Sequence, residues 1–271
     1  MNARYGDNNM IKEYQNGSDF ILENSSFLDQ NKYMSVFFYL DAKVLNKISS
    51  TNYAIKVENA KNKLLAIKVE PYNLLIYGDK ECLGELLKYL KDHGYECSGI
   101  MCGTSIGDKL IKELGYVQSI GMDFMETRKY TTPSSKEVIK ATIDDVDEIF
   151  ACYQCFLKDC GLKDKANRDN IIKKIDNFRI VKVNNMIVSM AAYTKATDDS
   201  CRITHVYTRP EYRCKGFARK VVNCVKNEIL DMGLIATLNV DQNNPISNHL
   251  YSSLGFKKVF SQGIYYLNKD R

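Results

Sequence analysis

The segment RITHVYTRPEYRCKGFARKVVNCVKNEILDMG, residues 202–233, most constrains the fold. Its first seven residues are rich in β-branched and aromatic side chains, which predicts a strand. The residues from Phe217 to Met232 predict a long amphipathic helix that Gly233 ends. Two cations, Arg213 and Lys215, and one glycine stand where this helix begins. Taken alone, the segment is either an anion-binding turn or an ordinary basic surface turn.

The residues around this segment predict further strands and helices. Thr142 is the expected N-cap of a helix that starts with TIDDVDEIF. The two asparagines at 184–185 separate two apolar runs, which is typical of a β-hairpin. The remaining expected elements are strands at 178–183, 186–195 and 235–240, a short helix from Pro245, and closing strands in FKKVF and IYYLN. This mixture predicts the α+β class, with a mixed α/β sheet flanked by helices.

The stretch TTPSS, residues 131–135, is the expected boundary between two domains. It is polar, holds one of the four prolines of the chain and separates two stretches of similar length. We therefore predict one domain over residues 1–130 and a second over residues 136–271.

A segment of the first half of the sequence resembles a segment of the second half. Residues 93–116 align with residues 232–256, so that Gly94 falls on Gly233 and KELGY falls on SSLGF. This repetition predicts an internal duplication. The first copy has no Arg-x-x-Gly turn before its helix, and Ile111 stands where the second copy has Tyr251.

Composition excludes several classes of protein. No stretch approaches the length of apolar sequence that a membrane helix needs, and the amino terminus has no apolar core of a signal peptide. The nine cysteines are scattered through predicted strands and helices, which indicates reduced thiols. Cys152 and Cys155 fit one face of a helix better than half of a metal site, so no metal is expected. These features predict a cytoplasmic protein that is neither exported nor membrane-spanning.

The net charge of +5 is concentrated in the second half. Residues before Lys136 carry 16 Lys and Arg against 17 Asp and Glu, whereas the rest carries 22 against 16. A modest local excess suits a small polyanionic ligand, while a nucleic-acid surface usually needs a broader basic stripe. Nucleic-acid binding is therefore a minor alternative.

Two motifs in the second half together resemble the GCN5-related N-acetyltransferase (GNAT) superfamily. VYTRPEYRCKGFA looks like the pyrophosphate loop of that family, through Pro210, Arg213, Gly216 and Ala218. NNPISNHLYSSLGF, which contains Asn244 and Tyr251, resembles the family's later Asn, Tyr and Gly-Phe segment. The resemblance covers about residues 138–268.

The resemblance implies a set of cofactor-binding residues. Backbone groups of Val206, Tyr207 and Thr208 would pair with the pantetheine arm of acetyl-CoA, as an added strand pairs with a sheet edge. Asn244 would bind the same arm near the point where two central strands separate. The pyrophosphate would be held by the loop and by the first turn of the helix, at Arg213, Cys214, Lys215, Gly216, Phe217, Ala218 and Arg219.

The resemblance also implies a catalytic acid. Tyr251 would protonate the departing CoA thiolate after an amine attacks the acetyl carbonyl, and a backbone amide in strand 202–208 would polarise that carbonyl. As alternatives, Tyr251 could be a core residue and Asn244 only a helix cap. The base that deprotonates the amine is left open between His205, Asp241 and water.

The resulting hypothesis is an acetyl-CoA-dependent N-acetyltransferase. Its catalytic domain would be the second, and the first would be a degenerate GNAT-like copy that acts as a scaffold or a substrate-binding or regulatory part. The acceptor would be a primary amine of a small molecule, amino acid or peptide, and the transfer would be direct, within a ternary complex. The alternative is a non-catalytic acyl-CoA sensor, and self-association is left open.

Overall fold

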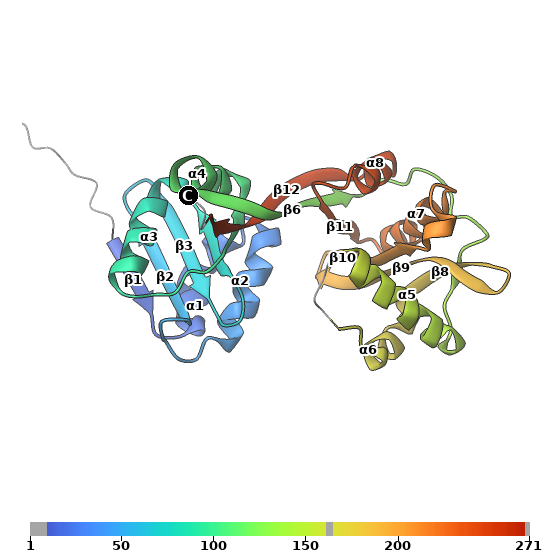
Figure 1. Cartoon of the computed structure of the whole chain (residues 1–271), viewed down its shortest axis with the longest axis horizontal. Coiled ribbons are helices and arrows are strands. Elements are labelled where there is room, and N and C mark those ends of the chain that lie inside the picture. The colour runs from blue at the N-terminus through green and yellow to red at the C-terminus, as the bar shows by residue number, and fades with distance from the viewer. Residues whose placement is uncertain (1–9, 161–164, 269–271) are drawn as a thin grey trace, which may run out of the picture. The chain divides into compact units, whose positions relative to one another are not determined.

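The computed structural model describes residues 10–160 and 165–268 of the chain. Contacts between residues divide the chain into two units (Figure 1). Unit 1 comprises Met1–Asp123 and Phe260–Arg271, and unit 2 comprises Phe124–Val259.

Unit 1 is a mixed sheet with helices on both faces. The strand order is β1-β2-β3-β4-β5-β12-β6, and β4 and β5 are parallel neighbours. Its elements are β1 (Met10–Tyr14), α1 (Gly17–Leu28), α2 (Lys32–Val44), β2 (Tyr53–Glu58), β3 (Lys63–Lys68), β4 (Leu74–Gly78), α3 (Leu83–Asp92), β5 (Ile100–Gly103), α4 (Thr104–Leu114), most of β6 (Tyr116–Thr127) and most of β12 (Lys257–Leu267).

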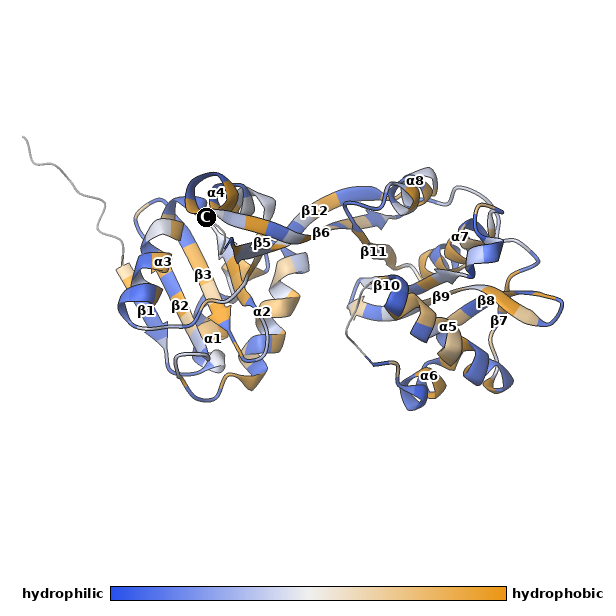
Figure 2. Cartoon of the chain, viewed as in Figure 1, coloured by the Kyte–Doolittle hydropathy of each residue, from blue (hydrophilic) through white to orange (hydrophobic). Residues whose placement is uncertain are grey.

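Alternating side chains build the two cores of unit 1. Leu64 and Ala66 of β3 pack with α3 and α4, whereas Leu65 and Ile67 pack with α1 and α2. Period-two alternation sends successive residues to opposite faces of a sheet. Because helices cover both faces, β3 has an unbroken apolar run from Leu64 to Ile67, and Figure 2 shows the middle of this strand in orange.

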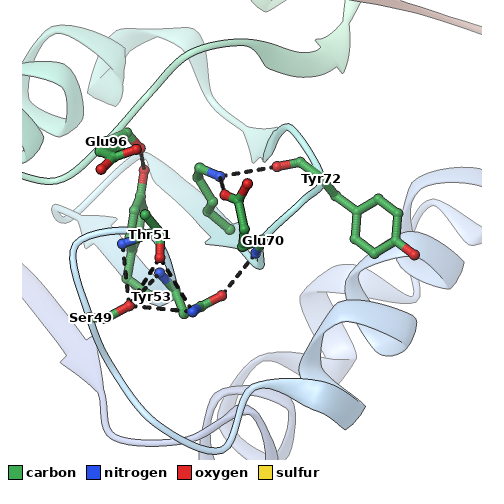
Figure 3. Close-up of polar contacts among 8 residues, drawn as sticks. Ser49, Thr51, Tyr53, Glu70, Tyr72 and Glu96 are labelled. Carbon is green, nitrogen blue, oxygen red and sulfur yellow. Dashed lines mark hydrogen bonds and ion pairs between the residues drawn. The ribbon is translucent and has the colours of Figure 1, made fainter.

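Polar contacts link the loops at one end of the unit 1 sheet (Figure 3). The Tyr53 hydroxyl donates to the Glu96 carbonyl at 2.8 Å, and the Asn52 side chain accepts from the Glu70 amide at 2.8 Å. The ammonium group of the buried Lys68 reaches the Glu70 carboxylate at 3.1 Å and the Tyr72 carbonyl at 3.2 Å. These bonds satisfy polar groups of the loops at the end of the sheet where β4 and β5 begin.

Unit 2 has a mixed sheet of order β6-β11-β10-β9-β8-β7, in which β10 and β11 are parallel. Helix α7 packs on one face, over the cluster that includes Val221 and Leu238, and α5 and α6 pack on the other, over the cluster that includes Phe178 and Tyr207. Its elements, after the end of β6, are β7 (Ile139–Lys140), α5 (Val146–Asp159), α6 (Arg168–Lys173), β8 (Phe178–Val183), β9 (Met186–Thr197), β10 (Ser200–Thr208), α7 (Phe217–Asp231), β11 (Ile235–Asp241), α8 (Pro245–Ser253) and the start of β12.

Helices and strands follow one another in the same order in both halves of the chain. The run from β1 to β6 is strand, two helices, three strands, helix, strand, helix, strand, and the run from β7 to β12 repeats it. In each run the parallel pair has three register partners, Leu74↔Ile100 to Ile76↔Cys102 and Ser200↔Ile235 to Arg202↔Thr237. The two halves therefore share one arrangement of elements.

The structure confirms the predicted fold class, a mixed α/β sheet flanked by helices. The hairpin of β8 and β9 turns at Asn184 and Asn185, which have φ of 50° and 63° and so fit the turn that two asparagines favour. The Thr142 amide donates to the Asp145 carboxylate at 2.8 Å in a capping box ahead of α5.

The carboxyl-terminal strand differs from the sequence prediction. The sequence placed residues 136–271 in the second domain, but the chain from Phe260 onward groups with unit 1. The reason is non-local pairing, because Gln262–Tyr265 pair with β5 in antiparallel register. Tyr265 is also buried against Gly107 of α4, where any Cβ would overlap its ring.

The TTPSS stretch is bound along α7, within unit 2. The Asn223 amide group donates to the carbonyls of Thr132 and Pro133, at 3.0 and 3.1 Å. Asn227 donates to the Thr132 carbonyl at 2.9 Å, and Lys226 donates to the Thr131 hydroxyl at 2.7 Å. Three polar residues of α7, within two turns of the helix, therefore fix this stretch. Phe124–Tyr130 lie in unit 2 rather than in the first domain.

No helix in the described parts of the chain is long and apolar enough to cross a membrane. All nine cysteines carry free thiols, and Cys152 and Cys155 lie on α5 as expected. Among the described residues, no three histidine, cysteine, aspartate or glutamate side chains lie together as a metal site would require.

Lys226 gives the first testable prediction. Burial, with a smaller contribution from Arg219, lowers the pKa of this fully buried lysine to about 8. Between about pH 8 and 10.5 the unfolded chain keeps a proton that the folded protein has lost, so the Lys226 contribution to stability improves as pH rises. The free energy of unfolding of the parent is therefore expected to rise by up to about 3 kcal/mol relative to that of Lys226→Met between pH 7 and pH 10.

Urea unfolding at both pH values measures this difference. Lys220→Met, on a half-exposed position of the same helix, is the control for loss of a lysine. An equal change for both variants would contradict the buried-charge explanation.

Candidate functional site

The central strands of unit 2 separate after three residue pairs. β10 pairs with β11 at Ser200, Cys201 and Arg202 only, although β10 continues to Thr208 and β11 to Asp241. The Thr237 hydroxyl donates to the Cys201 carbonyl at 3.2 Å at the point of separation. Beyond it, the described residues show no ladder between the facing edges of these strands. Backbone groups on the facing edge of β10 are therefore open to pair with a ligand.

A β-bulge interrupts β10 in this open stretch. Thr204 pairs with Ala192 of β9 and Tyr207 pairs with Met190, so two residues, His205 and Val206, stand opposite one. His205 has φ of 54°, an uncommon value for a residue other than glycine. The bulge changes the direction of the β10 backbone beside the gap, by which we mean the stretch after Arg202 where β10 and β11 no longer pair.

The His205 side chain lies against aromatic rings. Its ring centroid is 4.5 Å from that of Tyr153 and 5.3 Å from that of Phe178, and Nδ1 lies 2.8 Å from the Thr204 hydroxyl. Burial, with a smaller contribution from the Lys174 charge, lowers the pKa of His205 to about 4. The imidazole is therefore neutral near pH 7 and can accept a proton only weakly.

Tyr207 and Arg209 hold the end of β10 in place. Burial, followed by a hydrogen bond with the Cys155 thiol, raises the pKa of Tyr207 to about 12. Arg209 donates from Nε to the Ile187 carbonyl at 2.6 Å and from its guanidinium to the Glu148 carboxylate at 3.0 Å. The strand end that leads to the basic turn is thus tied to both β9 and α5.

The two cations of the turn form internal contacts. Arg213 donates from Nε to the Thr208 carbonyl at 3.0 Å and forms an ion pair with Asp159. Lys215 donates to the Glu211 carbonyl at 3.0 Å and lies 5.2 Å from the Tyr212 ring centroid. Both side chains therefore stabilise the turn, and an anion there would depend largely on backbone groups.

The backbone of the turn presents a row of free amides. Cys214 and Gly216 have φ of 59° and 81°, and no side chain caps α7. The Arg213 amide donates to Pro210 and the Lys220 amide to Gly216, but within the described chain no acceptor is found for the amides from Cys214 to Arg219. Such a row at a helix start attracts anions, because the helix dipole adds positive potential.

Phe217, Ala218 and Arg219 form the first turn of α7 as the sequence predicts. The Phe217 ring lies edge-on to Tyr212, with centroids 6.1 Å apart. The Arg219 guanidinium contacts Ser253 of α8 and donates to its carbonyl at 3.3 Å. Arg219 therefore joins the first turn of α7 to the last turn of α8.

Asn244 is the N-cap of α8. Its side-chain oxygen accepts from the Ser247 amide at 3.0 Å, and the residue is exposed. The cap role proposed as an alternative is thus present, and the NH₂ group of Asn244 is left to contact a ligand. Asp241, at the end of β11, is exposed and accepts from the Asn243 amide at 2.8 Å.

Tyr251 lies on α8 and is 7% exposed. It packs edge-on to Phe256, with centroids 6.1 Å apart, within the core cluster under α7. Burial, with a smaller contribution from Cys160 at the end of α5, raises the pKa of Tyr251 to about 12. The phenol stays protonated at physiological pH, as a proton donor must.

Unit 1 lacks these features at the matching position. β4 ends at Gly78, two residues after its last pair with β5. In unit 2, β10 continues for six residues after its last pair with β11. A short link, residues 79–82, then leads directly to α3, and its cations are limited to Lys80. Ile111 of α4, which aligns with Tyr251, is 39% exposed.

Comparisons with known proteins agree with this architecture. Residues 183–265 match the family described as FR47-like protein. No curated protein matches the sequence.

Two solved structures align over nearly the whole chain. A GCN5-related N-acetyltransferase from Sphaerobacter thermophilus is 14% identical, with a TM-score of 0.63, and the alignment covers 96% of this chain and 95% of that one. A GNAT-family acetyltransferase from Colwellia psychrerythraea is 12% identical, with a TM-score of 0.61, and the alignment covers 96% and 100%.

A third match is a fungal GCN5-related glucosamine N-acetyltransferase region in a multi-domain β-N-acetylglucosaminidase. It is 10% identical, with a TM-score of 0.55, over 98% of this chain and 39% of that one. At such identities the likeness establishes the fold alone. The chain therefore has the mixed α/β fold of these solved acetyltransferases.

Sequence reasoning missed two features of the site. One is Arg202, whose only signal was a charge at the first residue of the predicted strand 202–208. The other is the anchoring of the strand end by Arg209 and Glu148, which lie 61 positions apart in sequence. Neither could be placed without the sheet register.

His205 gives a prediction about acid stability. The unfolded chain takes up a proton at a histidine near pH 6.5, whereas folded His205 stays neutral down to about pH 4. The parent is therefore expected to lose up to about 3 kcal/mol of stability, relative to His205→Gln, as pH falls from 6.5 to 4.

Urea unfolding across this pH range measures the loss. His249→Gln, at an exposed position on α8, is the matched control. The same pH dependence in both variants would show that His205 is not held neutral by burial.

Proposed function

We propose that unit 2 is an N-acetyltransferase that moves an acetyl group from acetyl-CoA to a primary amine of a small molecule, amino acid or peptide. The observation that carries the proposal is the open edge of β10 beyond Arg202, which leads directly to the free amides at the start of α7. An extended arm with a pyrophosphate at one end has the shape and charge that this combination accepts.

Each part of the site has a role in this proposal. Backbone groups of Val206, Tyr207 and Thr208 pair with the pantetheine arm, and the amides of residues 214–219 hold the pyrophosphate. The Asn244 NH₂ group donates to the arm. These assignments are supported by the bulge, by the turn geometry and by the spare donors of Asn244.

The reaction proceeds by direct attack. The amine nitrogen forms a bond with the acetyl carbon, a backbone amide of β10 near the bulge polarises the carbonyl, and the carbon–sulfur bond breaks. Tyr251 donates its phenolic proton to the departing thiolate. The proton lost by the amine passes to His205, to Asp241 or to water. Since the pKa of His205 is about 4, a route through water competes well with the imidazole.

We further propose that unit 1 is a degenerate copy of unit 2 that does not bind CoA. Its support is the shared order of elements, together with the early end of β4 and the isoleucine at 111. The free thiols of all nine cysteines suit a reducing compartment, so a cytoplasmic location is part of the proposal.

One observation favours a second candidate, a non-catalytic acyl-CoA sensor. β10 carries no carboxylate, and in β11 the one acid is Asp241 at the strand end. A site without a strong base could bind the cofactor and transfer nothing. Thiol release from acetyl-CoA in the presence of a panel of amines separates the two candidates.

Gly216 tests the binding half of the proposal. Gly216 and Gly233 have φ of +81° and +74°, and a Cβ at either position meets open space within the protein. Changing either to alanine should cost about 1 kcal/mol of stability through left-handed strain. Gly216→Ala alone should also weaken CoA binding, by roughly tenfold or more, because its methyl group stands among the amides that face the pyrophosphate.

Isothermal titration with CoA and urea unfolding of the two variants measure these effects. Equal CoA affinity in Gly216→Ala and Gly233→Ala would remove the turn from the binding site.

Tyr251 tests the catalytic half. Tyr251→Phe keeps the ring and its packing on Phe256 but removes the proton donor. Thiol release with a good acceptor should fall roughly 100-fold while CoA affinity stays within about threefold. Tyr193→Phe, at a half-buried position on β9, is the matched control. Unchanged turnover in Tyr251→Phe would exclude this residue as the acid.

A further inference from the structure

Arg202 occupies the last residue pair before β10 and β11 separate. It pairs with Thr194 of β9 and Thr237 of β11. Directly paired residues point to the same side of a sheet, and Thr194 is two positions from Ala192, which belongs to the core under α5 and α6. The Arg202 side chain therefore projects on the α5 and α6 face, at the vertex of the gap.

Arg202 is a half-buried cation without a described partner. Between residues 165 and 268 the chain has six arginines, and the other five have acceptors. Those acceptors include Asp147 for Arg168, Glu228 for Arg179, Glu148 for Arg209, Asp159 for Arg213 and Ser253 for Arg219.

Burial lowers the pKa of Arg202, and no nearby carboxylate offsets it among the described residues. A guanidinium remains charged in proteins and has five N–H donors, so leaving it desolvated and unpaired is unfavourable. An anionic ligand would remove this cost.

The surrounding face is polar and positive. Thr204 of β10 and Thr237 and Asn239 of β11 share it by strand alternation. The bulge adds His205 to this face, where its ring lies against Tyr153 and Phe178. The exposed Lys174 is close enough for its charge to lower the pKa of His205. On these two strands the nearest acid along the chain is Asp241, two residues beyond Asn239. This face therefore carries Arg202 at the last residue pair and the Lys174 charge near the neutral imidazole.

We propose that Arg202 binds an anionic group of the acceptor, so that the substrate is a small amine that carries a carboxylate or a phosphate near its amino group. This inference rests on the proposed acetyl transfer. The bulge at His205 follows Arg202 by three residues, about 10 Å of extended strand. The arginine side chain and a small amino acid together span that distance, which brings the amine to the open part of the gap. Arg202 is thus a specificity-determining residue.

The test is acetylation of matched amines by the full chain. Glycine is compared with glycinamide, and 2-aminoethyl phosphate is compared with ethanolamine, which separates carboxylate from phosphate recognition. The variants are Arg202→Gln, Arg202→Lys and Lys195→Gln. Lys195 is exposed on β9 and pairs with Cys201, so its side chain lies on the opposite face of the sheet from Arg202. Lys195→Gln therefore removes one positive charge from that opposite face.

We expect the parent to prefer at least one anionic amine over its neutral partner. Arg202→Gln should lower kcat/KM for that amine roughly 10- to 100-fold more than for the neutral partner, mainly through KM, because a charged hydrogen bond is lost. Arg202→Lys should restore part of the preference, and Lys195→Gln should keep it. CoA affinity should remain within about threefold in all variants, which shows that the site is folded.

Three results would overturn the inference. If the parent acetylates neutral and anionic amines equally well, or if Arg202→Gln lowers both equally, the acceptor site does not read an anion through Arg202, while the proposed transferase activity stands. If CoA binds but none of the tested amines gives thiol release from acetyl-CoA, the proposed acetyl transfer is wrong, and the inference fails with it.

Discussion

The short parallel pairing of β10 with β11 determines what the rest of unit 2 can do. Three residue pairs hold the strands together, and the Thr237 hydroxyl bonds the Cys201 carbonyl where they part. Beyond that point both strands keep extended backbone without pairing to each other. Exposed strand edges are costly in isolation, since their amides and carbonyls need partners. A ligand with an amide-bearing arm can supply these hydrogen-bond partners. We therefore interpret the gap as a binding site.

The elements around the gap are fixed by contacts that do not involve the ligand. Arg209 and Glu148 tie the end of β10 to α5, and Arg213 bonds back to Thr208 and Asp159. Arg219 joins α7 to α8, the helix that carries Tyr251. The turn is therefore preorganised, so little ordering is required when an anion binds. Unit 1 has the same order of elements, but its β4 ends before an open edge can form.

Local features of the site followed well from the sequence. The turn at Asn184 and Asn185, the cap at Thr142 and the strand-to-helix passage at Gly216 depend on neighbouring residues, whose conformational preferences are strong. The order of strand, basic turn and helix was accordingly predicted with near-correct bounds. Assignment of Cys214–Arg219 to an anion remains a prediction, supported by their free amides.

Non-local features could not be predicted. The chain after Phe260 joins unit 1 because Tyr265 fits against Gly107, more than 150 positions away. The burial of Lys226 under residues 131–134 and the unpaired state of Arg202 depend on register and packing between distant segments. Periodicity in one sequence carries no information about such pairings.

Hydrogen–deuterium exchange with and without CoA tests the central claim, that the cofactor binds along β10 and at the start of α7 in unit 2. The account predicts slower exchange for amides of residues 203–208 and 214–219 when CoA is added, with no change at residues 77–84 of unit 1. Protection at residues 77–84, or unchanged exchange at residues 214–219 under saturating CoA, would contradict it.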